Sequence, residues 1–91
     1  MDWSAVVAES FRDLQRQASR AGVGEPLLSA FKQIVERLHN DPMEAGEPLY
    51  RLPVLRMQVR CVVIRPLIVH YAVCEEQPLV IIKGGKLLSD T

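Results

Sequence analysis

The sequence has little of what marks several large classes of protein. It contains only two cysteines, Cys61 and Cys74, which are too few for a disulfide framework and lack CxxC spacing. No apolar run approaches the roughly 18 residues that cross a bilayer. The first residues lack the basic stretch followed by an apolar stretch that marks a secretory signal. These absences predict a cytoplasmic protein with reduced thiols that does not enter a membrane.

Net charge is also absent, because eleven Lys and Arg residues balance eleven Asp and Glu residues. This balance argues against indiscriminate nucleic-acid binding, since domains of that kind are usually strongly basic. The charges are unevenly placed, however. Residues 49–73 contain no acidic residue and four basic ones: Arg51, Arg56, Arg60 and Arg65. Any anion-binding surface is therefore expected in the C-terminal half of the chain.

What the sequence does contain predicts one α+β domain over residues 1–91. The hydrophobic content of 48% is enough for a single small core. Apolar residues recur at helical spacing from Trp3 to about Arg20 and again from Pro26 to His39, with Asp2 as the expected N-cap. The loop between the two helices is short, so we predict a helical hairpin over about residues 3–39.

Three strands are predicted to follow over about residues 54–83. The segments Val54–Ile64, Leu67–Cys74 and Leu79–Lys83 are rich in β-branched residues, and turn residues separate them. Sequential antiparallel pairing is the simplest topology, which gives the order ααβββ. The tail over residues 84–91 is expected to be partly flexible.

The turn at Arg65-Pro66 sets the expected register. If this turn has two residues, Arg60 lies opposite Tyr71. One face of the first two strands then carries the more continuous apolar row and is predicted to pack on the helices: Leu55, Met57, Val59, Cys61, Val63, Ile68, His70, Ala72 and Cys74. The other face is expected to be open. A slip of one residue at the turn would exchange the two faces.

The face expected to be open supplies the candidate sites. Its basic end carries Arg56, Arg60 and Tyr71, where arginine can fork onto phosphate oxygens and tyrosine can stack on a base. The alternative is a solvated cation–π pair between Arg60 and Tyr71. Its apolar end carries a candidate partner surface, for which a covering C-terminal tail is the alternative: Val62, Ile64, Leu67 and Val69.

Cys61, His70 and Cys74 are predicted on one face but do not predict a metal site or a nucleophile. Zinc needs four ligands, or three and a water molecule. A cysteine nucleophile with His70 as its base would also need an orienting acid, and the predicted face offers none. Packed side chains are the favoured interpretation, and no metal or cofactor is predicted.

Several short motifs together resemble the RelE/ParE superfamily of toxins. They are Asp41-Pro42, Gly46-Glu47-Pro48-Leu49, Leu52-Pro53, Arg56, Val59-Arg60 and Val69-His70-Tyr71-Ala72-Val73. The resemblance covers about residues 27–83. It implies ribosome-dependent mRNA cleavage in one branch, gyrase poisoning in another, and neutralisation by an antitoxin protein. By position, Arg56 and Arg60 match the family's basic strand positions, and Tyr71 matches its strand tyrosine.

The chain also departs from that family. A strand normally precedes the first helix in the family, whereas this chain is predicted to begin directly in a helix, which leaves a free sheet edge. The dense Lys and Arg cluster of a ribosome-associated nuclease is missing, and no residue presents itself as a base, so the catalytic set of a RelE-like ribonuclease is incomplete. Two hypotheses follow. The first is a toxin-like module, active or divergent and inactive, that acts on RNA or translation and has an antitoxin, RNA or the ribosome as partner. The second is an inactive interaction module that forms a homodimer or binds a partner through its open face and free edge.

Overall fold

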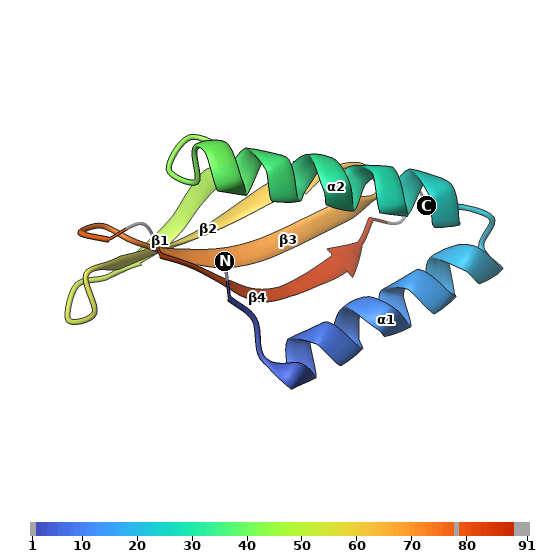
Figure 1. Cartoon of the computed structure of the whole chain (residues 1–91), viewed down its shortest axis with the longest axis horizontal. Helices are drawn as coiled ribbons and strands as arrows, with labels where there is room; N and C mark the ends of the chain where they lie inside the picture. The colour runs from blue at the N-terminus through green and yellow to red at the C-terminus, as the bar shows by residue number, and fades with distance from the viewer. Residues whose placement is uncertain (1, 78, 89–91) are drawn as a thin grey trace.

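The computed structural model describes residues 2–77 and 79–88 and shows a helical layer on one face of an antiparallel sheet (Figure 1). The elements follow in the order α1 (Ala5–Arg20), α2 (Gly24–Asn40), β1 (Glu47–Leu52), β2 (Met57–Ile64), β3 (Leu67–Cys74) and β4 (Val80–Leu87). The strands lie in the sheet in their sequence order, β1-β2-β3-β4. The predicted α+β class is confirmed, and the predicted number of three strands is wrong.

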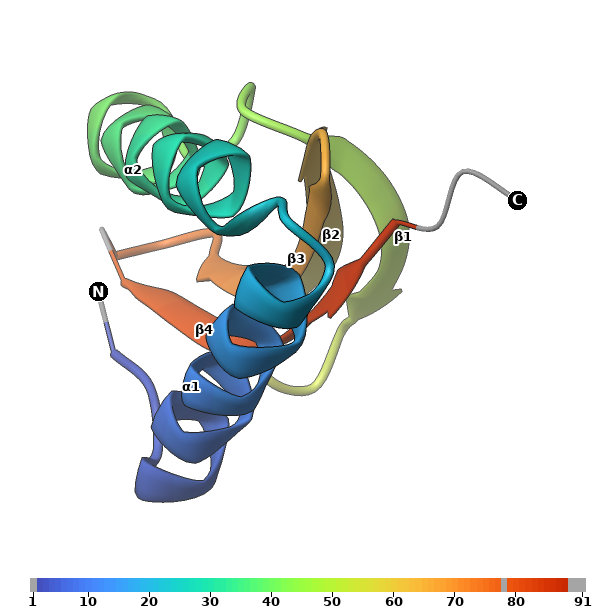
Figure 2. The same cartoon turned by 90° about the vertical axis from the view of Figure 1, so that its right-hand side faces the viewer.

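Both helices form where their apolar stripes were predicted, but the first begins at a different cap. Ser4 caps α1, because its Oγ accepts a hydrogen bond from the Val7 amide at 3.2 Å. Asp2, predicted as the cap, pairs instead with β4. Its amide donates to the Val80 carbonyl at 2.9 Å, and its carbonyl accepts from the Ile82 amide at 2.8 Å. The two helices run in opposite directions and diverge from their connecting loop (Figures 1 and 2).

The additional strand, β1, forms where sequence patterns predicted only a loop. Most of its residues are exposed, and Leu49 forms a bulge between Pro48 and Tyr50. The strand after it begins at Met57 rather than at residue 54, because residues 53–56 turn the chain and Arg56 has a φ of 52°. The flexible-tail prediction is wrong for residues 84–87, which belong to β4. Residues 89–91 lie outside the described part of the chain.

The predicted register between β2 and β3 is confirmed, with Arg60 opposite Tyr71 and Ile64 opposite Leu67. The predicted assignment of the two faces is wrong. The helices cover the face with the larger side chains, because these fill the space between a sheet and two helices better than the cysteines, alanine and histidine of the other face. The core residues of the sheet are Val62, Leu67, Val69, Tyr71, Val73, Val80 and Ile82.

The helices contribute a matching apolar stripe. Its buried members are Leu14 and Ala18 of α1 with Leu27, Ala30, Ile34 and Leu38 of α2. Each fully buried Leu or Ile contributes about 1.5–3 kcal/mol relative to exposure. Gly85 of β4 brings α1 close to the sheet, because a Cβ at that position would lie 2.8 Å from the Phe11 ring. No helix among the described residues is long and apolar enough to span a membrane.

Candidate interaction surface

The face of the sheet turned away from the helices is called the open face below. Strand pairing arranges its side chains in four rows across the sheet: Tyr50–Val59–Ala72–Ile81, Glu47–Cys61–His70–Gly84, Val63–Ile68–Lys86 and Leu52–Met57–Cys74. Within residues 2–77 and 79–88, both helices pack on the opposite face. The open face is therefore a mainly apolar surface, and these rows also contain one carboxylate, one imidazole and one ammonium group: Glu47, His70 and Lys86.

Several large side chains of the open face are accessible to solvent. Val63 is 48% exposed and Tyr50 is 53% exposed, while Ile68 and Ile81 are half-buried. A Cβ placed on Gly84 would meet nothing within 4 Å, which also shows that this part of the face is uncovered. Tyr50 and Ile81 share one row and Val63 and Ile68 another, with the row of Glu47 and His70 between them. Accessible apolar side chains gathered on one face of a small domain are typical of an interaction surface.

The centre of the open face is well packed even though no described element covers it. Val59 and Ala72 are buried because Tyr50 and Ile81 flank them in the same row. Strand residues that support one another in this way form a surface of fixed shape, so a partner would order few side chains on binding. The open face is thus preorganised as well as apolar.

The edges of the sheet are much less suited to pairing with another strand. On β1, Pro48 has no amide hydrogen to donate, and the bulge at Leu49 interrupts the strand. At the other edge, Asp2 pairs in parallel with β4 at Ile81. The first named element is a helix, as expected, but this isolated bridge occupies the β4 edge at Ile81. Proteins use such features to prevent edge-to-edge association, so the open face is the stronger candidate.

Arg60 and Tyr71, predicted as anion-binding residues of the open face, lie on the covered face. Arg60 is only 8% exposed and donates to the Gly46 carbonyl at 2.7 Å and to Gln58 Oε1 at 3.0 Å. Tyr71 is fully buried, and its hydroxyl donates to the Pro42 carbonyl at 2.8 Å. Burial raises the pKa of Tyr71, and the nearby Arg60 guanidinium opposes that rise.

Together these two side chains hold the loop between α2 and β1 against the sheet. The loop carbonyls that they bind lie 14 and 29 residues away in sequence. The prediction that Arg60 and Tyr71 sit on an accessible face, either as a phosphate site or as a solvated pair, is therefore wrong. Buried positions give no support to a role in RNA binding, which stays a prediction.

Arg56, the third anion-binding candidate, is exposed but ion-paired with Glu76. Arg51 of β1 holds Glu75 through Nε and Nη2, with hydrogen bonds of 2.8 and 2.7 Å. This bidentate contact and a bond from Gln58 lower the pKa of Glu75 to about 2. Both carboxylates follow the acid-free stretch in sequence, so only the strand register brings them to the arginines. An anionic ligand would have to displace them.

The predicted partner residues are also core residues. Val62, Leu67 and Val69 are buried, and Ile64 packs against them. The residues that take their place on the open face are Tyr50, Val63, Ile68 and Ile81. Val63 and Ile68 were predicted on the core face. Ile81 was predicted on a strand without an assigned face, and Tyr50 lies on β1, which was not predicted.

The row that contains Cys61 and His70 also contains the Glu47 carboxylate, which the sequence did not predict at this position. Glu47 lies opposite Cys61 on β1, so the row reads carboxylate, thiol, imidazole. Neighbouring strands lie about 4.8 Å apart, which puts Glu47 roughly 10 Å from His70 and too far to orient it. No group of three His, Cys, Asp or Glu residues within the described part of the chain could hold a metal ion.

Comparisons of the chain with protein-family models, with curated proteins and with solved structures each find no match.

Proposed function

We propose that this chain is a protein-interaction module that associates with a second copy of itself through the open face. The main support is that Val63 and Tyr50 are exposed, and Ile68 and Ile81 half-buried, on a sheet face that no described element covers. The blunted edges direct association to this face rather than to strand addition.

The size of the open face supports a weak dimer. Four strands spaced about 4.8 Å apart, with roughly six residues each, present about 400 Å². Two copies would bury about 800 Å² in total, which is below the roughly 1,200–2,000 Å² of standard stable interfaces. Most of the hydrophobic gain would offset the entropy lost on association. We therefore expect a dissociation constant of tens of micromolar, or about −6 kcal/mol.

Charges at the two margins of the open face favour one arrangement. Glu47 lies at the β1 margin, and Lys86 lies at the β4 margin in the next row. A two-fold axis parallel to the strands places the β1 margin of one copy over the β4 margin of the other. Glu47 of each copy then lies over the Gly84 position of its partner, one row from Lys86. This places opposite charges near each other at both margins of an apolar centre.

Sedimentation equilibrium with a matched pair of variants tests the proposal. Val63→Asp places a charge on the open face and should weaken association by at least about tenfold, or 1.4 kcal/mol. Val6→Asp is the control, because Val6 is 79% exposed on α1 and lies outside the open face. Wild type that is monomeric at about 200 µM, far above the expected constant, would contradict the proposal. Equal weakening by both substitutions would also contradict it.

A toxin-like module of a toxin–antitoxin system is the second candidate. One observation favours it besides the sequence motifs: Asp2 occupies a strand position beside β4, and the resemblance implies a strand before the first helix. Action on RNA or translation would need residues other than buried Arg60 and Tyr71. Growth arrest on expression in a bacterial host would support this candidate. Normal growth with verified soluble protein would count against it.

A further inference from the structure

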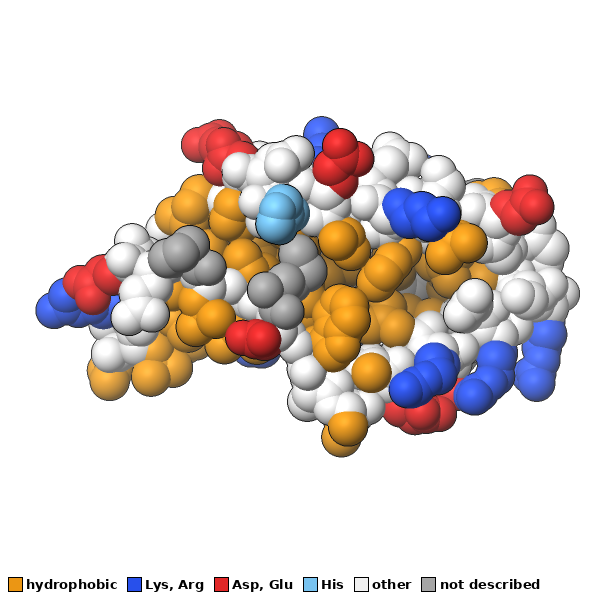
Figure 3. Space-filling view, in the orientation of Figure 1, with side chains coloured by type: hydrophobic (Ala, Val, Ile, Leu, Met, Phe, Trp, Pro, Cys, Tyr) orange, Lys and Arg blue, Asp and Glu red, His pale blue; other side chains and the backbone are white. Residues whose placement is uncertain are grey.

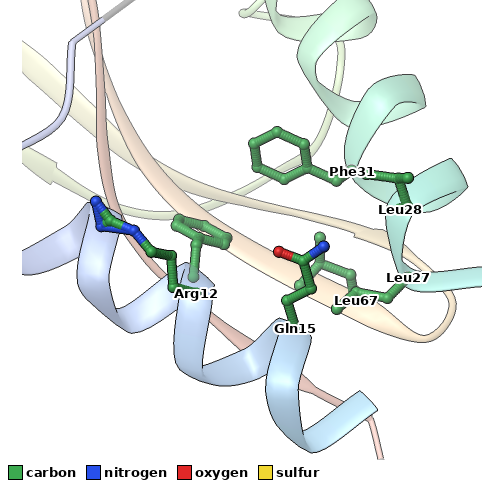
Figure 4. Close-up of a pocket in the computed structure, with 7 residues that line it drawn as sticks. Arg12, Gln15, Leu27, Leu28, Phe31 and Leu67 are labelled. Carbon is green, nitrogen blue, oxygen red and sulfur yellow. The ribbon is translucent and has the colours of Figure 1, made fainter. Parts of the chain in front are cut away.

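We propose that the pocket between the two helices binds a small aromatic carboxylate. This pocket has a volume of about 160 Å³ and lies on the helical side of the molecule, away from the open face (Figure 4). Its floor is Leu67 at the start of β3. Its walls come from three residues of each helix: Phe11, Arg12 and Gln15 of α1, and Leu27, Leu28 and Phe31 of α2.

The apolar part of the pocket fits one aromatic ring. A cavity of about 150 Å³ lined by aliphatic and aromatic side chains is large enough for benzene. Leu27 and Leu67 are buried at its base, and the rings of Phe11 and Phe31 meet edge to face with centroids 5.4 Å apart. Trp3 extends this cluster, with its ring centroid 6.3 Å from that of Phe31. A ligand ring would join an existing aromatic arrangement.

The mouth of the pocket supplies polar groups on one side. Arg12 and Gln15 are three residues apart on α1 and are both exposed. Figure 4 shows the Gln15 amide pointing into the gap between the helices and the exposed Arg12 side chain extending from α1 away from that amide. Both residues line the pocket. An arginine and an amide can together bind a carboxylate through several N–H donors. The pocket thus combines an apolar base with donors at its mouth.

The ion pair that Arg12 already makes leaves it available to a ligand. Arg12 Nη1 lies 3.2 Å from Glu9 Oε2, and both side chains are 57% exposed. Exposed pairs of this kind contribute little to stability, so a carboxylate that also buries its ring can compete with Glu9. The other guanidinium N–H groups of Arg12 remain free to donate to a ligand.

The wider charge pattern also favours an anion. Arg20 lies at the end of α1, and Lys32 lies on α2 next to Phe31. In Figure 3, Lys and Arg side chains lie on both sides of the hydrophobic strip between the helices. Among the described residues, Arg20 and Lys32 make no ion pair with a carboxylate. Unpaired cations beside the strip raise the local concentration of an anionic ligand.

The test is a titration of the ¹⁵N-labelled protein with phenylacetate, followed by amide chemical shifts. 2-Phenylethanol is the matched probe, because it has the same ring and chain length but no charge. We expect saturable shifts at residues 11–15 and 27–31 with a dissociation constant of about 1 mM. 2-Phenylethanol should bind about tenfold more weakly.

Three variants locate the site. Arg12→Gln should remove the preference for phenylacetate and leave the binding of 2-phenylethanol unchanged. Leu28→Trp should fill the pocket and abolish the binding of both probes; Gln15→Trp does the same from the other helix if Leu28→Trp fails to fold. Arg16→Gln, a substitution one turn away and outside the pocket, should change neither.

Three outcomes would overturn the inference: no saturable shifts up to about 20 mM, well above the expected constant; equal affinity for the two probes; or undiminished binding by a folded Leu28→Trp variant. The Val63→Asp variant should bind phenylacetate like wild type, because Val63 lies on the other side of the sheet. A result against ligand binding in the pocket can therefore be distinguished from a result against dimerisation.

Discussion

The two faces of the sheet are built from alternate residues of the same strands, yet they serve different purposes. The covered face carries Leu67, Val69 and Tyr71, which are almost completely buried beneath the helices. The open face carries Ile68, His70 and Ala72 from the same strand, and no described element lies over them. Both faces are apolar enough for a core, but two helices can cover only one of them. The uncovered face therefore remains available for a partner.

A charge placed in turn on each face gives the largest expected contrast. Val62→Asp buries a carboxylate without a partner and should cost more than about 4 kcal/mol of unfolding free energy, enough to unfold this small domain. Val63→Asp, on the adjacent residue but the open face, should cost less than about 1 kcal/mol. Urea unfolding, at a protein concentration below the dimer dissociation constant, measures the unfolding free energy of both variants. Similar losses for the two variants would mean that the faces are not distinct.

Arg60→Lys tests whether this arginine supports the loop on the covered face. Lysine keeps the charge but cannot reach the Gly46 carbonyl and Gln58 with the same planar group. Loss of one hydrogen bond from a buried charged group should lower the unfolding free energy by about 2 kcal/mol. Arg56→Lys, at an exposed position, should change it by less than about 0.5 kcal/mol. An unchanged unfolding free energy for Arg60→Lys would indicate that Arg60 lies on an accessible face.

The two adjacent glycines of β4 give a smaller contrast of the same kind. Gly85→Ala would place a Cβ 2.8 Å from the Phe11 ring and 3.0 Å from the Ile68 carbonyl, so it should destabilise the fold by about 1–2 kcal/mol. Gly84→Ala has open space on the other face and should be neutral or stabilising by about 0.5 kcal/mol. Thermal unfolding of the two variants compares them. Equal destabilisation would contradict the packing of α1 on β4.

The Arg51–Glu75 pair should give the smallest effect, visible as a pH dependence. The folded-state pKa of Glu75, at about 2, lies below its ordinary value. The pair therefore stabilises the fold above that ordinary value, and the stabilisation is lost as pH falls toward 2. The melting temperature of wild type should exceed that of Glu75→Gln at neutral pH, and the difference should vanish near pH 2. On an Arg51→Gln background, the effect of Glu75→Gln should be smaller, because only the hydrogen bond from Gln58 remains.

Much of the fold could be predicted because it depends on local patterns. The apolar stripes of the helices follow the 3.6-residue period, and the two-residue turn at Arg65-Pro66 fixes the register of β2 on β3. β1 was missed because Pro48, Arg51 and an exposed, bulged backbone do not give the alternation of a half-buried strand. Its pairing depends on β2, which is a non-local contact.

The candidate site could not be predicted in the same way, because it depends on which face the helices cover. The continuity of Val59, Cys61 and Val63 along β2 suggested the wrong face. The side-chain volumes of β3 and β4, with Tyr71 and Ile82 on one side and Ala72 and Gly84 on the other, decide the choice. The burial of Arg60 could not be predicted for a related reason. Its acceptor, the Gly46 carbonyl, lies in a loop that comes close to Arg60 only when the chain folds.

The most direct test of the central claim measures the solvent exposure of methyl groups on both faces at once. A soluble paramagnetic agent should broaden the methyl resonances of Val63, Ile68 and Ile81 in dilute protein and leave those of Val62, Val69 and Ile82 sharp. As the protein concentration rises through the tens of micromolar expected for dimerisation, the first group should become protected. Broadening of Val62 and Val69, or undiminished broadening of Val63 and Ile68 at the highest concentration, would contradict the account.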